Sequence, residues 1–172
     1  MDAGDWLTGK GRVLESPSVD YLTTDRLNVA RIPIKFREST WDYYPNNVPH
    51  KKLLLEYVDK LDEHREDGGG LLLCGESGVG KTSAACLIAL EVIKRNGYPM
   101  YVDARRIVPL ELGKYGPERR RKLRTCCFLV IDDLGSETTK DIGAGLIEGV
   151  IRSRDQRILP TKKTTKASFE VI

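Results

Sequence analysis

A glycine-rich stretch after a short apolar run constrains this chain more than any other feature. Residues 75–82, Gly-Glu-Ser-Gly-Val-Gly-Lys-Thr, follow Leu71–Cys74 and precede a helix-forming run, Thr82–Arg95. They match the pattern Gly-x4-Gly-Lys-Ser/Thr at every fixed position. Glycine lets the backbone curl until its N–H groups face a bound polyphosphate. A glycine-rich turn can match by chance, but this motif needs a strand–loop–helix setting and has it here. The stretch therefore predicts binding of a nucleoside triphosphate.

The residues of this loop have separate expected roles. Lys81 can reach the β- and γ-phosphates, which makes it a candidate catalytic residue, and the Thr82 hydroxyl is placed to ligate Mg²⁺. The expected cofactors are ATP and Mg²⁺. The segment expected to surround the triphosphate comprises Gly75, Glu76, Ser77, Gly78, Val79, Gly80, Lys81, Thr82 and Ser83.

Two acids end a second apolar run. Asp132 and Asp133 directly follow Phe128–Ile131. In a parallel sheet this places both carboxylates at the carboxyl edge, where the glycine-rich loop also lies. Asp132 is suited to hold Mg²⁺ through water, and Asp133 to orient or deprotonate the attacking water. A strand followed by two acids is common, but after a complete phosphate loop it indicates a P-loop NTPase.

Strand and helix patterns alternate along the 172 residues, a length that suits one domain. The expected strands are Leu71–Cys74, Met100–Val102, Thr125–Ile131 and Arg157–Thr165. The expected helices run from Val48-Pro49 to about His64, over Thr82–Arg95, over Ala104–Leu112 and over Thr139–Ser153. This alternation predicts a three-layer α/β fold with a parallel sheet. Residues 1–30 lack sustained periodicity, so we expect a loosely structured lead-in there.

Composition indicates a globular protein of the cytoplasm. Hydrophobic residues make up 40% and charged residues 31%, without an apolar run long enough to span a membrane. The first residues lack the pattern of a signal peptide. The four cysteines form no Cys-x-x-Cys pair, so we interpret them as small apolar residues of a reducing compartment. The two histidines lie far from any cysteine cluster, so zinc is not expected.

A basic stretch runs from Arg105 to Arg124. Eight positive residues there stand against Glu111 and Glu118, a net charge of +6 in a chain whose total is +3. Such a stretch can follow a phosphate backbone, or it can be a solvated connector, and the sequence favours neither. Tyr115 is the one aromatic residue within it, so base stacking is not implied.

The chain resembles DnaC-type replicative helicase loaders, and the related IstB-type transposition helper ATPases share the same AAA+ core. The segments that carry the resemblance are Arg31–Arg37 with Pro33 and Phe36, Gly75–Thr82, Ile131–Gly135 followed by Glu137, Leu159–Thr161 and Thr164-Thr165. The resemblance implies a AAA+ P-loop ATPase core over residues 31–172. It also implies an ATP-dependent switch that opens or places a ring helicase on single-stranded DNA. Implied partners are a replicative helicase or a transposase, single-stranded DNA, and further copies of this chain in a nucleotide-dependent homo-oligomer.

The sequence departs from this family in three places. Asp133 stands where many AAA+ proteins have glutamate, which predicts slow hydrolysis. Lys166 replaces the polar sensor, usually asparagine, and Lys162 and Lys163 occupy strand positions expected to be apolar. We expect this strand segment to be poorly packed, displaced to a sheet edge, or unrepresentative of the functional parent sequence.

The third departure is at the carboxyl end. The resemblance implies a further strand, an arginine finger and a helical lid after Ile172, so the AAA+ core is expected to be incomplete there. Arg152 and Arg154 lie on the preceding helix, and we consider a trans-acting role for either as a hypothesis.

Four functions remain open from the sequence, and the weakest is a small-molecule kinase, because no substrate-binding lid motif is visible. A helicase loader is the leading hypothesis, and a transposition helper ATPase acting on target DNA is the alternative within the same class. A nucleotide-gated binding module that scarcely hydrolyses ATP is the third, consistent with Asp133 and Lys166.

Overall fold

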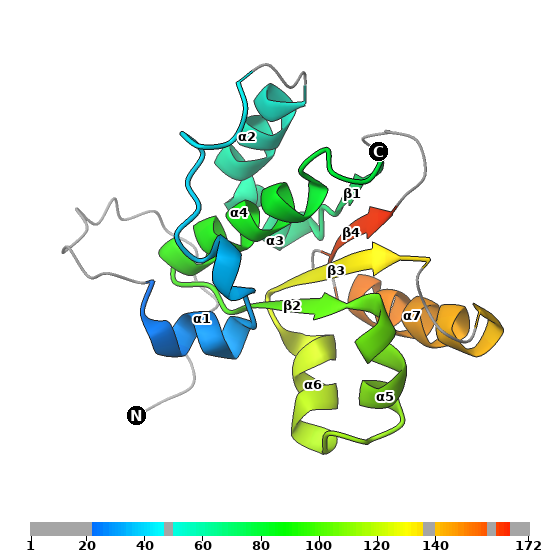
Figure 1. Cartoon of the computed structure of the whole chain (residues 1–172). Coiled ribbons are helices and arrows are strands. Elements are labelled where there is room, and N and C mark those ends of the chain that lie inside the picture. Colours follow the sequence, from blue (N-terminus) through cyan, green and yellow to red (C-terminus); the bar gives the residue numbers. More distant parts are fainter. Residues whose placement is uncertain (1–21, 47–49, 136–139, 158–160, 166–172) are drawn as a thin grey trace, which may run out of the picture.

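The strands described form one parallel sheet (Figure 1). The computed structural model describes residues 22–46, 50–135, 140–157 and 161–165. The strands are β1 (Leu71–Leu73), β2 (Pro99–Asp103), β3 (Phe128–Leu134) and β4 (Thr161–Thr165). Their order is β1-β4-β3-β2, and each adjacent pair is parallel. The carboxyl ends of these strands therefore meet at one edge of the sheet.

Strand β3 is buried on both faces because its apolar run is continuous. Phe128 and Val130 belong to the core cluster on one face, whereas Leu129 and Ile131 belong to the cluster on the other. All four side chains are fully buried. This is the burial pattern expected of a central strand in a parallel sheet.

Helices cover both faces of the sheet, as the sequence predicted (Figure 1). One face carries α1 (Thr24–Ala30), α2 (Lys51–Asp59), α3 (Leu61–Asp67) and α4 (Lys81–Lys94). The other carries α5 (Ile107–Glu111), α6 (Pro117–Thr125) and α7 (Lys140–Asp155). Two 3₁₀ turns, η1 (Ile34–Phe36) and η2 (Ala104–Arg106), follow α1 and β2. Within the described residues, no helix has the length and apolar content needed to cross a membrane.

Helix α4 is enclosed by the rest of the fold. Every residue from Ala84 to Leu90 is buried, as are Val92 and Ile93. A helix that is apolar on all sides is stable only when it is surrounded by other elements. Its first turn follows the glycine-rich loop directly, so the burial of α4 fixes the position of that loop.

Several elements differ from the sequence prediction. The single helix expected up to about His64 is split into α2 and α3 at Lys60, and its expected start at residues 48–49 lies outside the described residues. Helix α6 was not predicted. Helix α1 lies within the expected lead-in, where Thr23 caps it and Leu27 and Ala30 are buried. Residues 24–30 are thus packed structure, whereas residues 1–21 lie outside the described residues.

Strand β4 lies inside the sheet, so the prediction of a displaced edge strand is wrong. Lys162 is in register with Leu71 of β1 and Val130 of β3. Lys163 is likewise in register with a residue of each strand. Pairing on both sides places β4 beside β1, the strand that precedes the glycine-rich loop. Lys166, the expected sensor position, lies outside the described residues, as does Glu137.

Candidate nucleotide-binding site

The loop between β1 and α4 has a backbone that needs glycine. Gly78 and Gly80 have φ angles of 89° and 91°. For a residue with a Cβ atom, adopting this left-handed conformation costs about 1–2 kcal/mol. Gly80 caps α4, so the loop leads straight into the positive end of a 14-residue helix. Backbone N–H groups at such a helix start favour anions.

Lys81 lies against the loop's own backbone. Its Nζ atom donates hydrogen bonds to the carbonyl oxygens of Gly75 at 2.7 Å and Glu76 at 2.6 Å. These two bonds orient the ammonium group toward the start of the loop. The positive charge of Lys81 is thereby held at the loop that the sequence predicted to bind phosphate.

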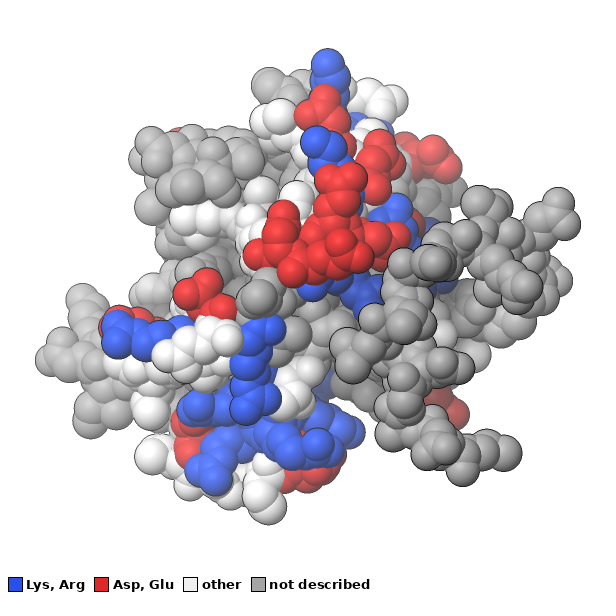
Figure 2. Space-filling model, turned by 180° about the vertical axis from the view of Figure 1, so that it is seen from behind, with Lys and Arg blue, Asp and Glu red and all other residues white. Residues whose placement is uncertain are grey.

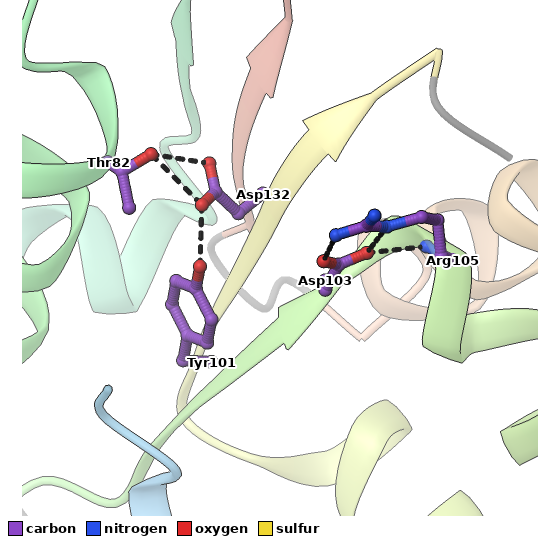
Figure 3. Close-up of polar contacts among 5 residues, drawn as sticks. All are labelled: Thr82, Tyr101, Asp103, Arg105 and Asp132. Atoms are coloured by element: carbon purple, nitrogen blue, oxygen red, sulfur yellow. Dashed lines mark hydrogen bonds and ion pairs between the residues drawn. The ribbon is translucent and has the colours of Figure 1, made fainter. Parts of the chain in front are cut away.

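The hydroxyl of Thr82 meets the carboxylate of Asp132. Thr82 Oγ1 donates to Asp132 Oδ2 at 3.0 Å and to Oδ1 at 3.2 Å (Figure 3). The Tyr101 hydroxyl donates to Oδ2 from β2 at 2.5 Å. Burial, reinforced by this hydrogen bond, raises the pKa of Tyr101. Asp132 is 7% exposed, so its carboxylate is held by donors from α4 and β2 at a nearly dry position.

Asp133 interrupts the regular strand. Its φ angle is 58°, and the register between β3 and β4 shifts between Ile131 and Leu134. Regular alternation would place neighbouring side chains on opposite faces of a sheet. A bulge redirects side chains, and here Asp132 and Asp133 line the same cavity.

One cavity of about 420 Å³ collects these groups. It is lined by Pro33, Lys35, Phe36, Ser77, Gly78, Gly80, Lys81, Thr82, Ser83, Tyr101, Asp103, Arg105, Asp132 and Asp133. The loop and the two acids predicted from the sequence therefore do converge. Gly75 and Glu76 contribute through their contacts with Lys81, and Val79 lines an adjoining cavity.

Six lining residues were not predicted as site residues, and two of them, Pro33 and Phe36, had entered the sequence analysis only through the family resemblance. Tyr101, Asp103 and Arg105 come from the end of β2 and from η2, and Lys35 comes from η1. Arg105 forms an ion pair with Asp103 and holds the pKa of that carboxyl below its ordinary value. Parallel strands of one sheet end at the same edge, so the residues after the predicted strand 100–102 could have been expected near Asp132. Asp103 and Arg105 are such residues. The sequence contained no comparable signal for Tyr101.

The oxygen atoms of Thr82 and Asp132 suit Mg²⁺ better than a metal ion whose ligands all come from protein side chains. No group of three or more His, Cys, Asp or Glu residues able to hold a metal occurs among the residues described. Mg²⁺ instead needs one or two oxygen ligands from protein, together with water and phosphate oxygens. The adjacent hydroxyl of Thr82 and carboxylate of Asp132 are oxygen donors of this kind.

The two arginines with a hypothesised trans-acting role lie in different surroundings. Arg154 is fully buried, and its Nη1 donates to the carbonyl oxygens of Cys126 at 3.0 Å and Leu123 at 3.3 Å. Burial lowers the pKa of Arg154. Arg152 is exposed and pairs with Glu148 at 2.6 Å. The hypothesis is therefore wrong for Arg154 and stays a hypothesis for Arg152.

A glycine-rich loop before a buried helix, with two acids at the end of the parallel strand one place beyond β4, defines a P-loop NTPase core, and the solved structures that it resembles place it among AAA+ domains. The chain's similarity is to helicase loaders of the DnaC type. A solved DnaC helicase loader is 26% identical, with a TM-score of 0.69, and the match covers 80% of this chain and 82% of that one. DnaI is 24% identical, with a TM-score of 0.65 and coverage of 77% and 72%.

A replication initiator shares the fold at lower identity. AMPPCP-bound DnaA from Aquifex aeolicus is 16% identical, with a TM-score of 0.63, and the match covers 78% of this chain and 43% of that one. The sequence itself matches no protein-family model and no curated protein. The fold is therefore that of replication-related AAA+ ATPases.

Proposed function

We propose that this chain binds ATP and Mg²⁺ beneath the Gly75–Thr82 loop and hydrolyses the ATP. The observation that carries the proposal is the contact between Thr82 and Asp132. These residues lie fifty positions apart, yet the hydroxyl of the first motif and the carboxylate of the second are separated by 3.0 Å. A glycine-rich turn that matched by chance would not be expected to meet an acidic strand end in this way.

Each side chain has a task in this proposal. Lys81 exchanges the carbonyl oxygens that it contacts for phosphate oxygens. Thr82 supplies a hydroxyl ligand, Asp132 accepts a hydrogen bond from metal-bound water, and Asp133 orients or deprotonates the attacking water. Mg²⁺, when bound, neutralises charge on the phosphate oxygens.

The adjoining cavity is suited to the adenine ring. It measures about 500 Å³, shares Gly78, Gly80 and Ser83 with the first cavity, and is lined by Phe36, Tyr43 and Tyr44. Tyr44 is 4% exposed and packs edge-on against Trp41, whereas Tyr43 is 85% exposed. We therefore assign Tyr44 to packing and Tyr43 to stacking on the base.

Thermal melting of the Lys81→Ala variant tests nucleotide binding. At a hundred times the dissociation constant, a ligand stabilises the native state by about 2.7 kcal/mol, or about 5–10 °C for a domain of this size. Lys81→Ala should lose most of this shift. The matched control is Lys94→Ala at the far end of the same helix, where the side chain pairs only with Glu91 among the described residues. Equal ligand-induced shifts in Lys81→Ala and Lys94→Ala would refute the proposal.

Turnover distinguishes an ATPase from a nucleotide-gated module. Asp133 is shorter than glutamate, so hydrolysis is expected to be slow. Phosphate release should rise when single-stranded DNA is added if the chain couples ATP to DNA. Nucleotide binding without phosphate release in either condition would favour the module.

A cluster of arginines supports contact with nucleic acid. The basic cluster, as it is called here, consists of Arg31, Arg106 and Arg119. They come from the end of α1, from η2 and from α6, respectively. Burial and the nearby charges of Arg119 and Arg106 lower the pKa of Arg31. No ion pair with an acid involves any of the three within the described residues, whereas Arg121 and Lys122 pair with Glu118.

Helix α6, which carries Arg119, holds four further basic residues. Figure 2 shows Lys and Arg side chains gathered over the lower part of the molecule, where α5 and α6 lie. Like charges held together favour binding of an anion, and a phosphate backbone fits such a surface. The replication initiator DnaA, which has the same fold, has been solved with AMPPCP and single-stranded DNA.

Salt-dependent binding of single-stranded DNA tests this surface. Replacing the three arginines of the basic cluster by alanine should weaken binding. It should also lower the slope of log affinity against log salt by about 2, because each lost phosphate contact contributes about 0.7. Arg121→Ala is the matched control, since Glu118 already neutralises that residue. If the triple variant kept the parent's salt dependence, the basic cluster would not contact DNA and the stretch would be a solvated connector.

The partner protein is best found by co-purification. Similarity to DnaC and DnaI loaders supports a replicative ring helicase. The nucleotide-bound chain should therefore retain such a helicase on an affinity column, and the Lys81→Ala variant should not. Retention of a transposase in place of the helicase would favour the transposition helper. Light scattering with and without ATP tests the proposed homo-oligomer.

A further inference from the structure

We propose that Tyr101 is a positioning residue for the metal site, with a hydroxyl that holds the Asp132 carboxylate in place facing Thr82. The inference rests on the proposed function, because the site it serves is the one assigned to Mg²⁺ above. It adds a residue from β2 to a site otherwise built from the glycine-rich loop and β3.

The hydroxyls of Tyr101 and Thr82 approach the carboxylate from different elements (Figure 3). Tyr101 donates to Asp132 Oδ2 at 2.5 Å, and Thr82 donates to the same oxygen at 3.0 Å and to Oδ1 at 3.2 Å. A hydroxyl bonded to an ionised carboxylate at about 2.5–2.7 Å belongs to the stronger class of hydrogen bonds. The hydrogen bond from Tyr101 is therefore shorter than either contact from Thr82.

The hydrogen bond from Tyr101 adds a restraint on the orientation of the Asp132 carboxylate. The terminal torsion of aspartate is broad, so a carboxylate at a strand end does not keep one orientation by itself. With Oδ2 bonded to Tyr101, rotation away from Thr82 would also break this 2.5 Å hydrogen bond. Asp132 is thereby held ready to accept a hydrogen bond from water on a metal ion beside Thr82.

Packing accounts for the ring of Tyr101 but not for its hydroxyl. The partly buried ring packs against the core cluster that contains α4. Phenylalanine would fill the same space. The hydroxyl reaches the cavity, where Lys81 donates to the loop backbone and Arg105 pairs with Asp103. Lys81 and Arg105 are thus engaged with other acceptors, and the phenol is the group that meets Asp132 from β2.

The test is a titration of Mg²⁺ at saturating ATP, followed by thermal melting. Loss of a group that orients a metal ligand typically lowers metal affinity 10- to 100-fold. Tyr101→Phe should therefore raise the Mg²⁺ concentration for half-maximal stabilisation about 10-fold. Binding of ATP in the presence of a chelator should be unchanged, because the triphosphate contacts of the loop are intact.

Tyr57→Phe is the matched control. Tyr57 is buried, and its hydroxyl donates to the Gly69 carbonyl at 2.8 Å, away from the cavity. This variant should melt at a lower temperature without ligand and keep the parent's Mg²⁺ midpoint. A Tyr101→Phe protein that behaves in the same way would mark its hydroxyl as merely structural and overturn the inference.

A double variant tests whether Tyr101 acts through Asp132. In an Asp132→Asn background, Tyr101→Phe should shift the Mg²⁺ midpoint no further, because coupled residues give non-additive effects. A full 10-fold shift in that background would also overturn the inference. A parent protein with no Mg²⁺-dependent stabilisation would refute the proposed function itself, and the inference would fall with it.

Discussion

Replacing Arg154 by alanine separates a structural arginine from one that acts on a neighbouring molecule. Arg154 is the largest fully buried side chain among the described residues. Its Nη1 atom bridges α7 to the end of α6 through the carbonyl oxygens of Leu123 and Cys126, and it also contacts Cys126 Sγ at 3.4 Å. Without the guanidinium, those carbonyl oxygens lose a donor and the core acquires a cavity.

The expected loss of stability is large. Truncating a long buried side chain to alanine costs about 2–5 kcal/mol, and a buried acceptor left without a donor costs about 1–3 kcal/mol. Because water can enter part of the cavity, we expect about 3–5 kcal/mol in total. For a domain of this size that corresponds to a melting temperature lower by about 6–20 °C.

The assay is thermal and urea unfolding of the parent, Arg154→Ala, Arg154→Met and Arg152→Ala. Methionine keeps much of the volume but no donor, so its loss should be intermediate. Arg152 is exposed and pairs with Glu148 one helical turn away, a contact that contributes about 0.3–0.5 kcal/mol. An Arg154→Ala protein that melts within about 2 °C of the parent but loses ATP turnover would refute the structural assignment.

The two acids of β3 should separate in function. Asp132→Asn should weaken Mg²⁺-dependent nucleotide binding, seen as a higher Mg²⁺ midpoint, while Mg²⁺-free binding persists. Asp133→Asn should bind nucleotide like the parent and release no phosphate. An Asp133→Asn protein that hydrolyses ATP at the parent's rate would refute the role assigned to that residue.

The parts of the site that the sequence predicted are those encoded locally. Gly78, Gly80, Lys81 and Thr82 sit in one short motif, and the strand before it and the helix after it are signalled by adjacent residues. The buried strand before Asp132 is likewise a continuous apolar run. Such features can be predicted because the residues that carry the sequence pattern are the same residues that form the loop and the strand end.

Tyr101 was missed because its role depends on strand order. The hydroxyl reaches Asp132 only because β2 pairs with β3 in the register that sets Tyr101 beside Val130 and Asp103 beside Asp132. Nothing in the residues around Tyr101 distinguishes it from a tyrosine that serves packing alone. Strand order is a tertiary property, and side chains that depend on it need the fold before they can be assigned.

Helix α6 was missed for a different reason. Leu123 is its one buried residue, so it lacks the apolar stripe from which a helix is usually predicted. Its start carries another signal, since Pro117 occupies the first turn and Glu118 follows it. The basic stretch was therefore not recognised as helical, although most of its charges lie on α6.

The edge position, one of three expectations for β4, is wrong because it followed from the side chains of the strand alone. Lysines at 162 and 163 conflict with the apolar pattern of a covered strand, which favoured an edge position. Each strand residue also carries a backbone donor and an acceptor, and the parallel pairing of β4 with β1 and β3 satisfies these groups on both sides. Backbone pairing and chain connection thus determine the position of β4, even though its lysines do not match the apolar pattern of a covered strand.

The packing of α4 on β3 sets the geometry on which the proposed chemistry depends. Thr82 lies in the first turn of α4 and Asp132 near the end of β3, so their separation follows from how these elements are held. Ile88 of α4 and Val130 of β3 lie in the same core cluster and are fully buried. Protein interiors are close-packed, so a change of volume there moves α4 relative to β3. The contact between Thr82 and Asp132 is therefore a property of the core as much as of the two motifs that meet in it.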